Sequence, residues 1–194
     1  MSHVSTTRPR SFGRLMPAVL LTLVGVVTLS PSANAQDAIT AESAAVIQAS
    51  FVADLDAMRE KFIGLAEAFP QDKYSWRPMD GVRSVSEVLM LIATEGYGFA
   101  PTSLGGEAAM AREEIQELRS ITDKADVISH LNRGFDYAKA QLEGIDPSTL
   151  TGRFGRRERT APEAVLGVTG DMHEHLGQLI AYARTNQIVP PWSQ

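Results

Sequence analysis

The sequence has 194 residues, with 18 basic and 23 acidic side chains and no cysteine. Its net charge of −5 disfavours nucleic acid and anionic membranes as partners, and the lack of cysteine excludes a thiol nucleophile, a disulfide and a thiolate metal site. Stability therefore has to come from packing, for which a single domain of this length is sufficient.

Residues 1–35 have the pattern of a secretory signal peptide. Three arginines precede the apolar run LMPAVLLTLVGVVTLS, and the small residues Ala33 and Ala35 follow it. The run is interrupted by Pro17 and is shorter than the roughly 20 residues of a membrane span, although an uncleaved N-terminal anchor is the alternative. We expect cleavage after Ala35 and export, to the periplasm or out of the cell, of one domain over residues 36–194. This domain carries 15 basic and 23 acidic residues, a net charge of −8, so we expect no membrane partner after cleavage.

Four amphipathic helices are predicted in the exported domain. The first covers residues 41–69, with apolar residues at alternating steps of four and three. The second covers about 85–99 and starts at a capping box, Ser84-Val85-Ser86-Glu87. The third begins near 123 and ends before Gly144, and the fourth follows the capping box Thr160-Ala161-Pro162-Glu163 and runs to about Asn186. The stripe of the first helix comprises Phe51, Leu55, Met58, Phe62, Leu65 and Phe69.

The segments between these helices are predicted to be connections. PQDKYSWRPMDGVR is rich in turn formers, AREEIQELRS is expected to be a short exposed helical piece, and the basic TGRFGRRER is expected to be a solvated loop. No strand pattern is visible. Because four amphipathic helices can hide their apolar faces only against one another, we predict an all-α four-helix bundle.

Helical geometry, at about 100° per residue, points a few polar residues into this bundle. On the fourth helix His175 lies inside the apolar arc and Asp171 at its edge, whereas His173 lies outside and is expected in solvent. On the second helix Glu95 lies in the middle of the inward arc. Glu95, Asp171 and His175 are therefore candidate ligands for a divalent ion such as Zn, Mn, Fe or Ni. The alternative is that Asp171 only holds the imidazole, while Glu95 pairs with an arginine or faces water.

Other residues of these helices are assigned to a face in the same way. Phe99 belongs to the inward arc of the second helix, while Met90 and Tyr97 lie on its outward side. They are either ordinary scattered exposed apolar residues or part of a homodimer contact. His130 lies at the margin of the third helix and is predicted to be a surface histidine.

Three stretches of the chain carry a family resemblance. They are, in order, DKYSWRPMDGVRSVSEVLMLIA, HLGQLIAYAR and TNQIVPPWS. Together they resemble the DinB-like (DinB/YfiT) family of bacterial four-helix-bundle metalloproteins. The resemblance implies a metal held by three histidines, one on the second helix and two at i, i+4 on the last. By motif these positions are Leu91, Asp171 and His175, so only the last histidine is retained and an altered site is implied.

Two functions are left open. One is an exported hydrolase or transferase that acts on a small molecule through a divalent metal held by Glu95, Asp171 and His175, since family members include metal-dependent thiol transferases and isomerases. An exported protein meets little cytosolic thiol, so hydrolysis by a metal-bound water is the favoured reaction. The other is a metal-free periplasmic bundle that binds a small ligand or a protein partner, which Leu91 favours.

Overall fold

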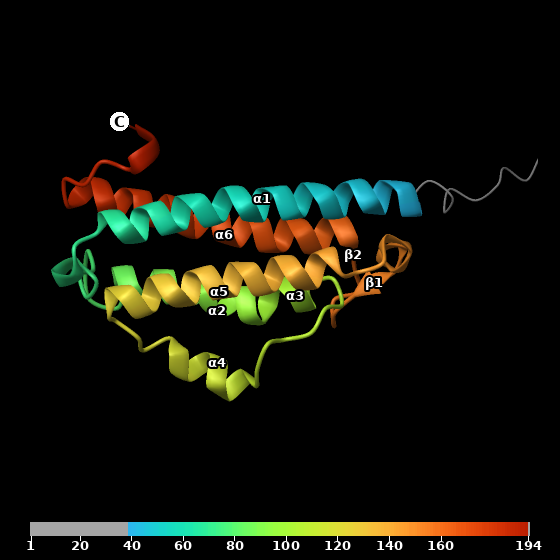
Figure 1. The fold of residues 1–194 in the computed structure, drawn as a ribbon, viewed down its shortest axis with the longest axis horizontal. Helices are drawn as coiled ribbons and strands as arrows, with labels where there is room; N and C mark the ends of the chain where they lie inside the picture. Colours follow the sequence, from blue (N-terminus) through green and yellow to red (C-terminus); the bar gives the residue numbers. More distant parts are fainter. Residues whose placement is uncertain (1–38, 194) are drawn as a thin grey trace, which may run out of the picture. The chain divides into compact units, whose positions relative to one another are not determined.

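The computed structural model describes residues 39–193, and the predicted signal peptide lies outside them. The described residues are mostly helical, which confirms the all-α prediction. The four long helices are α1 (Ala41–Ala68), α2 (Val85–Tyr97), α5 (Lys124–Glu143) and α6 (Ala161–Thr185). α1 lies beside α6, and α2 packs along α5 (Figure 1). None of the described helices is both long and apolar enough to cross a membrane.

α1 follows its predicted stripe. All six apolar residues of the stripe are buried, and α1 packs mainly against α5 and α6. The helix begins at the N-cap Thr40, whose hydroxyl accepts a hydrogen bond from the backbone N–H of Ser43. Beyond its C-terminus the turn η2 (Gln71–Lys73) leads to Tyr74, which is buried and donates a 2.7 Å hydrogen bond to the carbonyl oxygen of Ala66.

α2 is buried on every side rather than on one face. Its capping box is present, and of its 13 residues only Glu87 is not buried. Met90 and Tyr97 are 0% and 5% exposed, so the prediction that they face outward is wrong. The reason is that α5 and the short helix α4 (Arg112–Leu118) cover the side that the sequence pattern left open. These two residues cannot form a surface contact, and a homodimer stays a prediction without them.

The packing of α2 on α5 depends on two glycines. A Cβ added at Gly96 would come within 2.5 Å of the backbone of Gly134. A Cβ added at Gly134 would in turn overlap the carbonyl oxygen of Ala93. The two backbones therefore touch at a point where any side chain would separate the helices.

α2 also ends two residues earlier than predicted. The backbone of Gly98 is not helical (φ −136°, ψ −67°), and the separate short helix α3 (Phe99–Thr102) starts after it. Phe99 is therefore 41% exposed, and its predicted place on the inward arc is wrong.

The segment before α6 contains structure that was not predicted. A turn, η3 (Pro147–Thr151), is followed by β1 (Arg153–Phe154) and β2 (Arg159–Thr160), which pair antiparallel. Two residues per strand are too few to show an alternating pattern in a sequence. A last turn, η4 (Pro191–Ser193), follows α6.

Candidate functional site

The three predicted site residues lie in a row between α2 and α6. Glu95, near the end of α2, is only 9% exposed. The carboxyl group of Asp171 on α6 lies close enough to hydrogen-bond with it. Oδ2 of Asp171 is 3.8 Å from Nε2 of His175, one helical turn later on α6.

The carboxyl group of Glu95 keeps its proton at neutral pH. Burial, followed by the negative charge and hydrogen bonding of Asp171, raises the pKa of Glu95 to about 8, although Arg119 and Arg83 oppose the shift. Oε2 of Glu95 and Oδ2 of Asp171 are buried atoms without a partner among the described residues. Ionised carboxylates only accept hydrogen bonds, so a proton on Glu95 supplies the missing donor. At neutral pH Glu95 is therefore uncharged.

A chain of hydrogen bonds fixes the orientation of His175. The hydroxyl of Tyr182 donates to the carbonyl oxygen of Arg83 at 3.0 Å, so it accepts from Nε2 of Gln178 at 2.7 Å. The carbonyl oxygen of Gln178 must then face His175, where it lies 2.9 Å from Nδ1. Because this oxygen only accepts, Nδ1 carries a proton, and Nε2 is the ring nitrogen that faces Asp171.

These residues do not fit the three-histidine centre that the family resemblance implies. Leu91, at the position of the first histidine, has no ligating atom. Within residues 39–193 no three histidine, aspartate or glutamate side chains are arranged to hold a metal ion. Arg83 and Arg119 lower the pKa of Glu95 and so bring positive charge to the place where a cation would bind. The two partnerless carboxylate oxygens are what a cation would satisfy.

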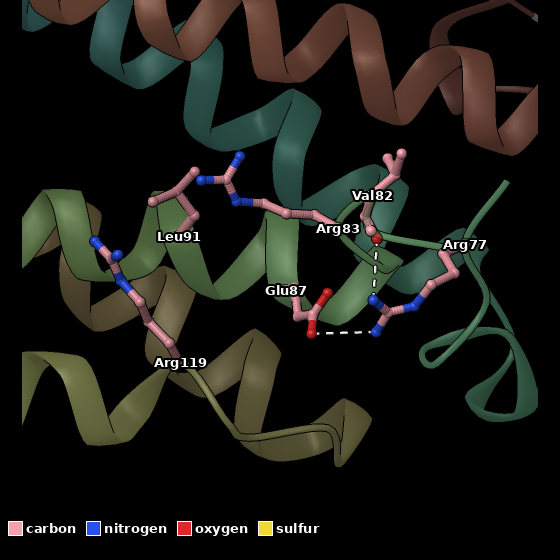
Figure 2. A pocket seen from close by; sticks show the side chains of 7 residues that line it. Arg77, Val82, Arg83, Glu87, Leu91 and Arg119 are labelled. Atoms are coloured by element: carbon pink, nitrogen blue, oxygen red, sulfur yellow. Dashed lines mark hydrogen bonds and ion pairs between the residues drawn. The ribbon is translucent and has the colours of Figure 1, made fainter. Parts of the chain in front are cut away.

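A cavity of about 370 Å³ lies over Leu91. Figure 2 shows that Arg83 and Arg119 both extend towards Leu91, Arg83 from the loop before α2 and Arg119 from the end of α4. Arg77, at the other end of the cavity, is held by Glu87 at 3.1 Å and by the carbonyl oxygen of Val82 at 3.0 Å. The side chains that extend towards Leu91 are therefore the cationic Arg83 and Arg119, which are not metal ligands.

A second and larger cavity, of about 750 Å³, lies between α2, α3 and α4. Glu95 lines it on one side, and Phe99, Met110 and Ile115 line an apolar side. Arg119 lines this cavity as well as the first, and its Nε donates a 3.2 Å hydrogen bond to Oγ1 of Thr94. The sequence pattern missed Arg119, because it follows a helix that was expected to be exposed and that carries no long apolar stripe.

His173 and His130, the other histidines within residues 39–193, do not line these cavities. His173 is exposed, as predicted, and its Nε2 lies 3.2 Å from Oδ1 of Asp54. His130 is half-buried, its Nδ1 lies 3.2 Å from the hydroxyl of Tyr97, and burial lowers the pKa of His130. The prediction of a simple surface histidine at this position is therefore wrong, because Tyr97 itself faces inward.

The comparisons with known proteins agree with the fold. A family model described as the DinB superfamily matches residues 54–179. The chain belongs to the DinB superfamily. The matched part of this DinB-superfamily protein runs from α1 into α6 and contains Glu95, Asp171 and His175. No curated protein and no solved structure matches the chain.

Proposed function

We propose that this DinB-superfamily protein is an exported four-helix bundle that binds a small molecule without a metal, in the cavity between α2, α3 and α4. The observation that carries the proposal is the buried Glu95, which is uncharged at neutral pH and lines a cavity of about 750 Å³. Cavities that hold small ligands have volumes of roughly 300–1,000 Å³, mostly apolar walls and a few polar groups. Export rests on the signal-peptide pattern of residues 1–35.

The cavity combines polar groups that can orient a ligand through hydrogen bonds with an apolar wall that can bury its apolar part. The carboxyl group of Glu95, whose proton is donated to Asp171, offers an acceptor oxygen to a ligand, and Thr94 and Gln116 add further polar groups. Phe99 and Ile115 supply apolar area, each buried CH₂ group of a ligand being worth about 0.8 kcal/mol.

Two fluorescent probes test the proposal, the organic anion 1-anilinonaphthalene-8-sulfonate (ANS) and its uncharged counterpart N-phenyl-1-naphthylamine (NPN). We expect at least one of them to bind the mature protein at one site per chain. Ala108→Trp would fill the cavity, since Ala108 lines it and is exposed, and should abolish that binding. Ala109→Trp is the matched control, because Ala109 is also exposed but does not line the cavity. A probe affinity that Ala108→Trp leaves unchanged would contradict the proposal.

A metal-dependent hydrolase or transferase is the second candidate. It is favoured by the partnerless oxygens of Glu95 and Asp171, which with His175 would be the ligands of a Zn, Ni, Mn or Fe ion. Elemental analysis of the mature protein, with thermal melting before and after a chelator, separates the two candidates. A metal at 100 times its dissociation constant stabilises the folded state by about 2.7 kcal/mol. Stoichiometric metal that is lost in His175→Ala would establish the second candidate, whereas no metal and no change in melting would remove it.

A further inference from the structure

The arginines of this acidic protein are concentrated around its cavities. Residues 36–194 contain 11 arginines, and seven of them line at least one of three cavities. Two of these cavities, over Leu91 and beside Glu95, are described above. The third, of about 420 Å³, lies beside the β1–β2 pair, is lined by Arg157 and Arg159, and shares Arg156 with the cavity beside Glu95.

Very little negative charge balances these arginines. Among the residues that line the three cavities only Glu87 and Glu95 are acidic. Glu87 is already paired with Arg77, and Glu95 is one carboxyl group against the remaining arginines. In a domain with a net charge of −8, these cavities are therefore positively charged, and they attract anions.

The following inference rests on the proposed function. We infer that the ligand of the cavity beside Glu95 is an organic anion, whose carboxylate or phosphate binds Arg119 and whose apolar part packs against Phe99 and Ile115. Arg119 is half-buried, and the hydrogen bond from its Nε to Thr94 holds the guanidinium at the cavity wall. Its two terminal nitrogens make no hydrogen bond within residues 39–193. A guanidinium held in this way presents its donors to a carboxylate or phosphate in a fixed geometry.

Part of the cavity lining is apolar and would contact the apolar part of the ligand. Phe99 is 41% exposed at the cavity, and Met110 and Ile115 lie on the same lining. A hydrophilic anion such as inorganic phosphate would leave this wall in water, whereas an alkyl or aryl group would cover it.

The test compares ANS with NPN, which differ in the negative charge. We expect ANS to bind more tightly than NPN, and Arg119→Gln to weaken ANS binding by about tenfold or more, since hydrogen bonds to charged groups are the stronger ones. Arg133→Gln is the control, because it removes the same charge from an exposed position that lines none of the three cavities. Arg119→Lys keeps the charge but loses the fork and should give an intermediate affinity. Arg156→Gln, at an exposed arginine of the cavity, repeats the test without altering the half-buried Arg119.

Competition against ANS identifies the anionic group. Octanoate and octyl phosphate share an alkyl chain, and octanol is the uncharged control. Displacement by either anion at a concentration at least tenfold below that needed for octanol supports the inference, and the better of the two anions names the group.

Equal displacement by octanol, or equal effects of Arg119→Gln and Arg133→Gln, would overturn the inference. NPN binding that Ala108→Trp abolishes would then still support a small-molecule site. If neither dye responds to Ala108→Trp, the inference and the proposed function both fall.

Discussion

Replacing Glu95 by glutamine should change how stability depends on pH. Glutamine has the shape of the protonated carboxyl group, keeps a donor for Asp171 and cannot ionise. In the native protein the pKa of Glu95 is raised from 4.5 to about 8, so the folded state retains a proton that the unfolded state has released. The associated stability is fully present below pH 4.5 and is lost as the pH rises through about 8.

The expected size follows from proton linkage. Between these pH values the free energy of unfolding falls by about 1.4 kcal/mol per pH unit, so the native protein should lose about 2 kcal/mol relative to Glu95→Gln between roughly pH 5.5 and 7. Urea unfolding followed by circular dichroism measures this difference, in which the contributions of other titrating groups cancel. Glu87→Gln is the control on the same helix. The hydrogen bond from the backbone N–H of Ser84, with help from Arg77, lowers the pKa of Glu87. Glu87 is therefore ionised in both the folded and the unfolded state over this pH range, and no such difference is expected. A difference between the native protein and Glu95→Gln that stays constant with pH would refute the raised pKa of Glu95.

Further predictions concern the packing of α2 on α5, the metal positions of the family and export. Gly134→Ala should lower the free energy of unfolding by about 2–3 kcal/mol, because the new Cβ meets the backbone of α2. Gly177→Ala, at an exposed position with open space, should raise the free energy of unfolding by about 0.5–1 kcal/mol. Equal melting temperatures for the two variants would show that α2 and α5 do not touch at Gly134. The double variant Leu91→His/Asp171→His should bind one Zn or Ni per chain by elemental analysis, and failure to do so would show that these are not the family's metal positions. Mass spectrometry of the exported protein should show cleavage after Ala35, and an intact N-terminus would contradict the signal peptide.

Much of the helical architecture follows from local signals. The stripe that begins at Phe51 predicted α1, because a period near 3.6 residues is written into the order of apolar and polar side chains. The capping boxes at Ser84 and Thr160 placed the starts of α2 and α6 correctly, since these hydrogen bonds join residues three positions apart. Features that depend on neighbours far along the chain were missed. Met90 was assigned to the surface because its own helix gives no sign that α4 and α5 cover it.

The same division applies to the site. Asp171 and His175 share a helix face at i, i+4, and Glu95 lies on the inward arc of its own helix, so their positions were predictable from helical geometry. The role of Arg119 was not, because its guanidinium reaches Thr94 only through the docking of α4 on α2. The uncharged state of Glu95 likewise depends on burial and on a carboxylate from another helix, which no local pattern contains.

The most direct test of a metal-free cavity for organic anions is calorimetric titration of octanoate into the mature protein, with and without a chelator. We predict saturable binding of one octanoate per chain that is unchanged by the chelator and is weakened by about tenfold or more in Arg119→Gln. Binding that disappears after chelation and returns on addition of Zn would contradict this account, and would place a metal held by Glu95, Asp171 and His175 at the centre of the protein's function.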